Sequence, residues 1–150
     1  MDDRSLHGRI LRYGPLAAWI VVILVLGSGM GSMNETSRFI RPLLEFLFPE
    51  APPETLAIYH GYIRKLAHFA EYGVLALFAA RAFATSSSAV LARNFWVASA
   101  ALALIVAAID EFRQSYDPSR TSSVYDVLID LSGAAAALII VAAVRRRTSR

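Results

Sequence analysis

Four apolar runs divide the chain, and polar residues enter them only near their ends. Residues 15–30, 95–109 and 131–144 carry no charge, and residues 66–80 are apolar except for three polar side chains near the start of the run. A membrane-spanning helix needs about 20 mostly apolar residues, which these runs reach once their polar flanks are included. The pattern therefore predicts an all-α membrane protein with four transmembrane helices, over residues 14–32, 62–84, 92–112 and 125–145.

Residues 33–61, between the first two predicted spans, are too polar to cross a membrane and too apolar to be a free linker. Apolar side chains recur there at helical spacing: Phe39, Ile40, Leu43, Leu44, Phe46, Leu47 and Phe48. This spacing predicts an amphipathic helix on the membrane surface, stopped by the three prolines within residues 49–53. The segment either caps the helix bundle or forms a lid or a lipid-facing entrance. Residues 85–94 are expected to form an ordinary short turn.

Composition agrees with a single membrane domain. At 150 residues the chain is one domain by length, and its hydrophobic fraction of 56% and mean hydropathy of +0.47 exceed the usual soluble range. The absence of cysteine excludes disulfides, thiolate metal sites and a lipoprotein anchor. The net charge of +3 does not indicate nucleic acid as a partner, because the basic residues sit at the ends of the apolar runs.

The first run also has features of a signal peptide, with a basic start and small residues at its end. No clear cleavage site precedes a soluble domain, however, and three further apolar runs follow. We therefore expect an uncleaved first helix, whose glycines allow close contact with other helices.

Charge sets the expected orientation. With four spans both termini lie on one side, and that side collects nine of the 15 basic residues, including the run Arg145, Arg146 and Arg147 after the last span. The positive-inside rule makes this side, and hence both termini, cytoplasmic. The start of the second span, the end of the third and the start of the fourth then meet at the outer leaflet. They share one membrane face under either orientation, because that follows from the span count.

The second span carries a polar stripe near its start. Lys65, His68 and Tyr72 follow each other at i, i+3 and i+7, so they share one helix face, and Glu71 flanks it. Polar side chains inside a membrane segment are costly, so they should face protein or water and they indicate a functional site. His68 can act as a general base, since imidazole titrates near neutral pH. Alternatively, His68 and Glu71 only form hydrogen bonds with a neighbouring helix.

Carboxylates and an amide close the third span. Adjacent side chains cannot point the same way on a helix, so one of Asp110 and Glu111 should face the polar stripe, while Gln114 lies one turn further on. The other carboxylate should pair with Arg113 or Arg120, or face water. Paired carboxylates can divide acid and base work between them, or they can bind a hard divalent cation.

The connection to the fourth span and its first turns complete the polar set. Asp117 and Pro118 predict a turn that presents Arg120, whose planar fork of donors suits a phosphate, unless it snorkels or pairs with an acid. Asp126 and Asp130 lie at i and i+4 on the fourth span. Asp130 is about one turn deeper in the membrane, and His68 or Lys65 is its expected partner. Gly133 continues their face and should let another helix approach closely.

Together these residues resemble the VanZ-like family of small bacterial membrane proteins. The resemblance rests on Lys65-x-x-His68-Phe69-x-Glu71-Tyr72 and Asp110-Glu111-x-x-Gln114, followed by Pro118-x-Arg120 and Asp126-x-x-x-Asp130-x-x-Gly133. Order, spacing and hydrophobic context agree across residues 60–140. Asp130 stands where Asn or Asp is expected in the family. The resemblance implies one VanZ-like transmembrane domain over residues 1–150, located in the bacterial cytoplasmic membrane.

The resemblance also implies a function class. The family is named for a glycopeptide-resistance accessory protein associated with teicoplanin resistance, and its members are proposed to modify lipid head groups or lipid-linked cell-envelope precursors. For this chain the first hypothesis is an enzyme that acts on a phosphate-bearing lipid head group at the outer leaflet. His68 is then the base or nucleophile, and Glu71, with Asp110 or Glu111, orients it or acts as the acid. The expected substrate-binding residues are Lys65, Tyr72, Gln114, Arg120, Asp126 and Asp130.

Two other functions compete with this enzyme hypothesis. The same pocket can serve a non-catalytic accessory protein that binds a lipid or an antibiotic. A transporter or proton relay is disfavoured, because only Ser99 is polar in the inner halves of the first, third and fourth apolar runs. No cofactor is expected. The Asp126-x-x-x-Asp130 spacing is similar to that of metal-binding helices in phospholipid head-group transferases, but their other motif residues are missing here.

Overall fold

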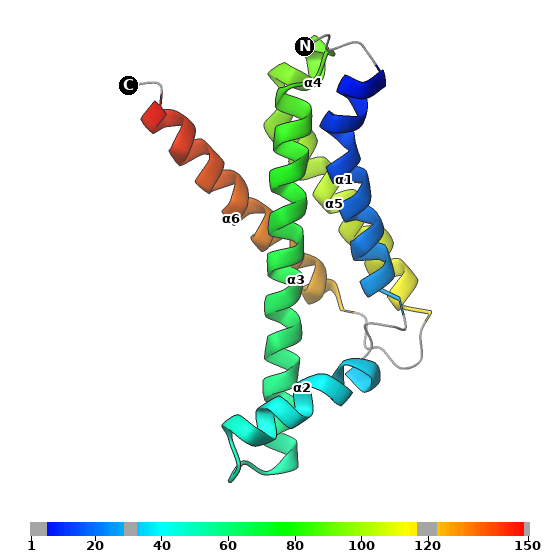
Figure 1. Ribbon diagram of the computed structural model, residues 1–150, viewed down its shortest axis with the longest axis vertical. Helices are drawn as coiled ribbons and strands as arrows, with labels where there is room; N and C mark the ends of the chain where they lie inside the picture. The colour runs from blue at the N-terminus through cyan, green and yellow to red at the C-terminus, as the bar shows by residue number, and fades with distance from the viewer. Residues whose placement is uncertain (1–5, 29–32, 117–122, 149–150) are drawn as a thin grey trace.

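The computed structural model describes residues 6–28, 33–116 and 123–148, which are helical almost throughout (Figure 1). In chain order the helices are α1 Leu6–Leu26, α2 Met33–Leu47, α3 Pro53–Ala84, α4 Ala89–Arg93, α5 Phe95–Gln114 and α6 Val124–Thr148. Among them α1, α3, α5 and α6 are long and apolar enough to span a membrane. The predicted all-α class with four membrane helices is therefore confirmed.

Two helices begin earlier than predicted, because polar flanking residues are helical too. α1 begins at Leu6 instead of residue 14, contains Pro15 in its interior, and ends at Leu26, just before a glycine-rich stretch. α3 begins at Pro53 instead of residue 62. Proline is tolerated in the first turn of a helix, where the N–H that it lacks would have no partner. Pro53 was expected only to stop the preceding helix, but it also begins the next one.

The segments that connect the long helices agree only in part with the predictions from the sequence. The predicted helix after the first span is present as α2, which ends at Leu47, two residues before Pro49. Leu44 is buried, while Phe39 and Phe46 are 80% and 81% exposed. The contact of these exposed side chains with a bilayer stays a prediction, since no membrane is part of the structure. Residues 85–94, expected to be a turn, instead contain the short helix α4.

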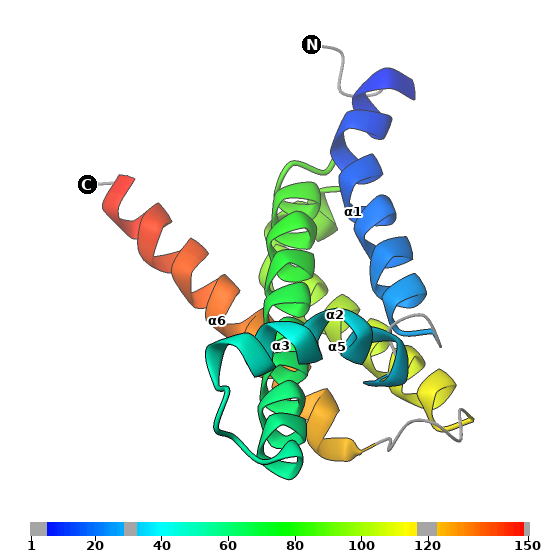
Figure 2. The ribbon, with the colours of Figure 1, turned by 60° about the horizontal axis from the view of Figure 1, so that its bottom comes forward.

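The four long helices alternate in direction, so their ends fall into two groups (Figure 1). The start of α1, the end of α3, the start of α5 and the end of α6 lie at one end of the molecule. The opposite group comprises the other ends of these helices, and there α2 runs beneath the bundle and across the first half of α3 (Figure 2). The polar starts of α3 and α6 and the polar end of α5 therefore lie on the same side.

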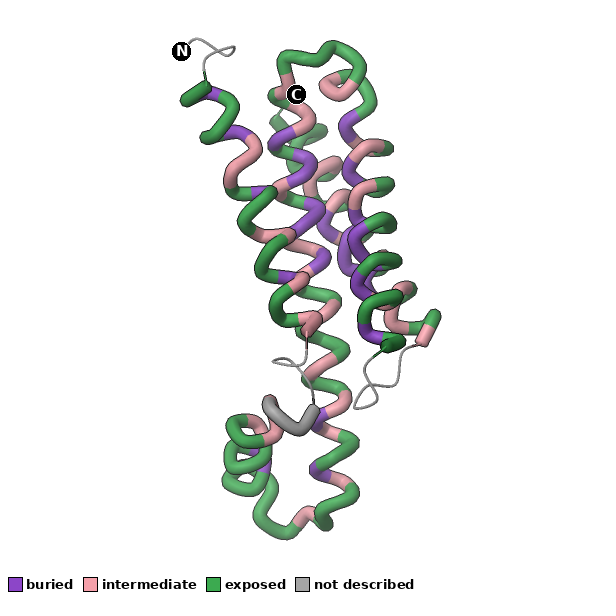
Figure 3. The backbone as a smooth tube through the Cα atoms, turned by 90° about the vertical axis from the view of Figure 1, so that its right-hand side faces the viewer, coloured by how far each residue is buried: buried purple, intermediate pink, exposed green. Residues whose placement is uncertain are grey.

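α3 is the central helix and contacts each of the others. The buried residues lie mainly in the four-helix part, whereas the residues of α2 and of the start of α3 are mostly exposed (Figure 3). Many core positions are small, which allows close packing between membrane helices: Ala76, Ala79, Ala103, Ala107, Ala134 and Ala137. α1 is held to α3 by Trp19, whose Nε1–H donates to the Glu71 carbonyl at 2.9 Å.

Two glycines form the crossing between α3 and α6. A Cβ atom added to Gly133 would lie 2.0 Å from the backbone oxygen of Phe69, far inside contact distance. On the facing helix, a Cβ added to Gly73 would lie 3.4 Å from the backbone oxygen of Gly133. The predicted role of Gly133, to let another helix approach closely, is confirmed, and the partner is α3. This close approach places His68 opposite the first half of α6.

Candidate functional site

A histidine–carboxylate pair bridges α3 and α6. His68 Nδ1 lies 3.3 Å from Asp130 Oδ1, slightly beyond the hydrogen-bond range of about 2.7–3.2 Å. Asp130 is only 3% exposed. Hydrogen bonds of acid–base groups are often long without substrate and shorten when it binds. The pairing of Asp130 with His68, one of two partners expected from the sequence, is present, and it does not involve Lys65.

Tyr72 lies one turn further along α3 and is fully buried. Within the described part of the chain its hydroxyl has no hydrogen-bond partner. A buried polar group without a partner is costly, so such a group in a native fold calls for an explanation. Tyr72 thus shares the buried environment of the His68–Asp130 pair.

α5 contributes a second buried polar pair. Gln114 Nε2 donates to Asp110 Oδ2 at 2.8 Å, and both side chains are nearly inaccessible. Gln114 Oε1 in turn accepts a long hydrogen bond, 3.4 Å, from the Nη2 of Arg64 on α3. The backbone just after α1 closes over this pair, because a Cβ added to Gly27 would lie 1.9 Å from Asp110 Oδ1. Asp110 is therefore the acid of the third span that faces the interior.

Glu111 points elsewhere, as its adjacency to Asp110 requires. Its Oε1 accepts a short hydrogen bond from the backbone N–H of Ser123, just before α6, and the side chain is partly buried. Arg113, one of its two expected partners, instead donates to the Leu24 carbonyl at 3.1 Å. Glu111 thus joins the end of α5 to the start of α6.

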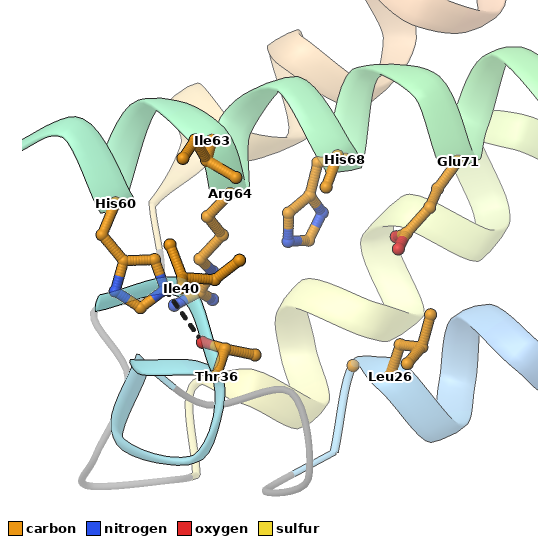
Figure 4. A pocket seen from close by; sticks show the side chains of 10 residues that line it. Leu26, Thr36, Ile40, His60, Ile63, Arg64, His68 and Glu71 are labelled. Carbon is orange, nitrogen blue, oxygen red and sulfur yellow. Dashed lines mark hydrogen bonds between the residues drawn. The ribbon is translucent and has the colours of Figure 1, made fainter. Parts of the chain in front are cut away.

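A pocket opens beside His68, between α1, α2 and the first half of α3 (Figure 4). Its volume is about 170 Å³, and one helix face of α3 supplies most of the polar lining. The polar side chains are Thr36, His60, Arg64, His68 and Glu71, and the rest of the lining is Leu26, Gly27, Ile40, Ile63 and Ala67. α2 closes one end, where Thr36 Oγ1 and His60 Nε2 lie 3.0 Å apart. The pocket is therefore mostly apolar, with a row of ionisable groups along one wall.

His68 belongs to both the buried pair and the pocket. Its Nδ1 is buried against Asp130, so the Nε2 edge of the ring faces the pocket (Figure 4). A carboxylate on one ring nitrogen fixes the orientation and tautomer of the imidazole, and leaves the other nitrogen to accept a proton. This arrangement can perform general acid–base chemistry on a group bound in the pocket.

The remaining predicted residues lie outside this pocket. Lys65 is exposed and does not line it, although it was expected to share the face of His68. Asp126 is partly buried in the first turn of α6, where its N–H donates to the Ser123 carbonyl at 2.8 Å. Arg120 lies outside the described residues. The structure thus brings together His68, Glu71 and Asp130, with Tyr72, Asp110 and Gln114 behind them.

The sequence analysis missed three polar residues of the pocket, Thr36, His60 and Arg64. A signal was present, because residues 60, 64, 68 and 71 are spaced by four, four and three positions and so follow one helix face. The predicted start of the span at residue 62 excluded His60 from that helix. Thr36 comes from a different helix, and no local pattern links it to His60.

The described residues contain no cluster of three or more histidine, aspartate and glutamate side chains placed to hold a metal ion. Independence from a cofactor stays a prediction.

Comparison with known proteins identifies a family. The family model described as VanZ/LLP1 matches residues 14–145 of the chain. No curated protein and no solved structure matches it.

Proposed function

Because the chain belongs to the VanZ/LLP1 family and has four candidate membrane helices, we propose that it is a membrane enzyme acting on a phosphate-bearing lipid head group. The observation that carries this proposal is the His68 ring, held by Asp130 on one edge and facing the pocket with the other. The pocket lies between α2 and the ends of the membrane helices, where a lipid head group would be found. A structural histidine would not need an open edge.

The chemistry follows from the two edges of the ring. His68 Nε2 takes the proton of an attacking hydroxyl, from water or from an alcohol, while its oxygen forms a bond to phosphorus. The bond from phosphorus to the leaving oxygen breaks, and that oxygen receives the proton from Nε2. Asp130 stabilises the imidazolium that exists between the two steps. Proton transfer by a positioned side chain contributes about 10²–10⁴-fold to such rates.

Location and biological role belong to the same proposal. The basic ends of the helices favour a cytoplasmic membrane location with both termini inside, which puts the pocket at the outer leaflet. A lipid or lipid-linked precursor of the cell envelope is then the substrate, and tolerance of glycopeptides such as teicoplanin is a phenotype to examine. The alternative is an accessory protein that binds a lipid or an antibiotic in this pocket without turning it over.

The test compares His68→Ala and Asp110→Asn with wild type in cells, by profiling lipids and cell-wall precursors. His7→Ala is the matched control, since His7 is an exposed histidine on α1 outside the pocket. We expect one lipid species to accumulate in both site variants and not in the control. Lost drug tolerance with unchanged lipid and precursor profiles would favour the accessory protein, and profiles and tolerance equal to wild type would refute a role for this pocket.

A further inference from the structure

The pocket has opposite charges at its two ends. Arg64, His68 and Glu71 follow one another along α3, so His68 lies between the cation and the anion (Figure 4). Arg64 and Glu71 are seven positions apart, which is about 10 Å along a helix. A ligand in this pocket therefore meets a positive group near α2 and a negative group on the far side of His68.

Arg64 is built to receive an anion. Among the described residues its guanidinium donates one long hydrogen bond, to Gln114, and so uses one of its five N–H donors there. Gln114 is itself held by the buried Asp110, so these two residues fix the orientation of the Arg64 guanidinium. His60 and Thr36 stand beside it at the end of the pocket closed by α2. Arginine and polar side chains together are the usual partners of phosphate oxygens.

Size limits the ligand as well. A cavity of about 150 Å³ is large enough for benzene, and this pocket has about 170 Å³. That space suits a phosphate with a short substituent, whereas the head group of a lipid-linked oligosaccharide would have to remain outside. The apolar walls formed by Leu26, Ile40 and Ile63 suit the part of an acyl chain that lies next to the glycerol.

We propose that the pocket binds a small zwitterionic head group of the phosphoethanolamine class. Its phosphate lies against Arg64, His60 and Thr36, and its ammonium group lies towards Glu71, which places the phosphate ester next to His68 Nε2. The catalytic role of this pocket rests on the proposed function. Binding of the head group does not depend on turnover. Glu71 is then a specificity residue that favours a cationic substituent over a neutral or anionic one.

The test measures binding to the purified full chain in detergent by native mass spectrometry. The probes are phosphatidylethanolamine, phosphatidylglycerol, phosphatidic acid and, as a soluble competitor, phosphoethanolamine. We expect wild type to prefer phosphatidylethanolamine, and Arg64→Gln to weaken its binding by about tenfold or more, the cost of one charge-assisted hydrogen bond. Glu71→Gln should abolish the preference over phosphatidylglycerol while leaving the binding of phosphatidic acid intact or improved.

Matched controls separate this site from general charge attraction. Arg38→Gln removes a cation from the exposed surface of α2 and should change none of the affinities. Arg64→Lys, which keeps the charge, should restore part of the binding, and thermal unfolding shows whether each variant is folded. If free phosphoethanolamine competes as strongly as the lipid, the binding site is supported, and its ligand is the soluble compound and not the lipid. Equal affinities for all three lipids, or equal losses in Arg64→Gln and Arg38→Gln, would overturn the proposal.

His68→Ala distinguishes this inference from the proposed function. Any loss of affinity in this variant should apply to all three lipids alike, so the preference for phosphatidylethanolamine remains, whereas the lipid profile of the cells changes. Lost turnover without any head-group preference in wild type would refute the inference alone. A clear preference without any turnover would refute the enzyme and keep the binding site.

Discussion

At the scale of single residues, the buried Tyr72 hydroxyl stands out, because burying a polar group without a hydrogen bond lowers the stability of the fold. The ring is fully buried in the core, and within the described chain the hydroxyl makes no hydrogen bond. Tyr72→Phe removes only this oxygen. Because an unsatisfied buried polar group costs about 1–3 kcal/mol, we expect the variant to unfold at a higher temperature than wild type.

The control for this prediction is Tyr72→Ala, which leaves a cavity and should cost about 3–5 kcal/mol. Both values come from thermal unfolding of the purified protein in detergent. A less stable Tyr72→Phe protein would mean that the hydroxyl has a stabilising partner. Higher stability together with lost lipid turnover would place the hydroxyl on the substrate, the role that the sequence suggested.

Single residues also mark the limit of what the sequence could predict about the site. His68, Asp130 and the division between Asp110 and Glu111 followed from helical spacing and from the cost of charge in a membrane. The choice between the neighbours Arg64 and Lys65 did not follow. Both are cations at the start of an apolar run, and only the packing of α2 and α5 against one face of α3 turns Arg64 into the pocket and leaves Lys65 outside.

At the scale of helices, the crossing of α3 and α6 depends on a missing side chain. Gly133→Ala would place a methyl group 2.0 Å from the Phe69 carbonyl oxygen, so the two backbones must separate. Gly61→Ala is the matched control on α3, since a Cβ there meets nothing within 4 Å. We expect Gly133→Ala to lower the unfolding temperature. Gly61→Ala should raise it or leave it unchanged, because alanine favours a helix over glycine by about 0.5–1 kcal/mol.

The same substitution should affect the site, because the crossing sets the distance between His68 and Asp130. Lipid profiling of cells that carry Gly133→Ala should therefore resemble that of His68→Ala. Equal stability and equal lipid profiles for the two alanine variants would show that the close approach is not needed.

The sequence predicted which segments form long helices better than it predicted where those helices begin. The apolar runs identified α1, α3, α5 and α6, because length and hydrophobicity decide whether a segment can cross a membrane. The runs could not show that α3 continues back to Pro53, since residues 53–61 are not apolar enough to be counted in a span. Those residues are helical because α2 packs on them, and that contact is tertiary.

At the scale of the whole molecule, α3 is longer than a bilayer core. Its 32 residues extend about 48 Å, against a hydrocarbon thickness of about 30 Å. We therefore expect the first part of α3, together with α2, to project from the membrane on the side of the pocket. Phe39 and Phe46 on α2 are exposed and can rest on the bilayer surface beside it.

This arrangement predicts the accessibility of the two ends of the bundle. The chain has no cysteine, so single cysteines can be introduced without removing any. Glu45→Cys on α2 and Ser87→Cys before α4 are both exposed positions at opposite ends of the bundle. We expect an impermeant thiol reagent to label Glu45→Cys in intact cells and Ser87→Cys only after permeabilisation. The reverse pattern would invert the orientation, and equal labelling of both in intact cells would contradict the span count.

The distribution of the site over several helices has a consequence for how the protein is made. His68 and Asp130 are 62 positions apart, which at about 5–20 residues per second is several seconds of translation. During that interval α3 enters the membrane with a histidine whose carboxylate partner has not yet been synthesised. An unpaired polar group in lipid is costly, so α3 is less stable in the membrane until α6 packs against it. Completion of the site thus also ends a vulnerable stage of biogenesis, and chains that stop before α6 should be degraded faster than the full-length protein.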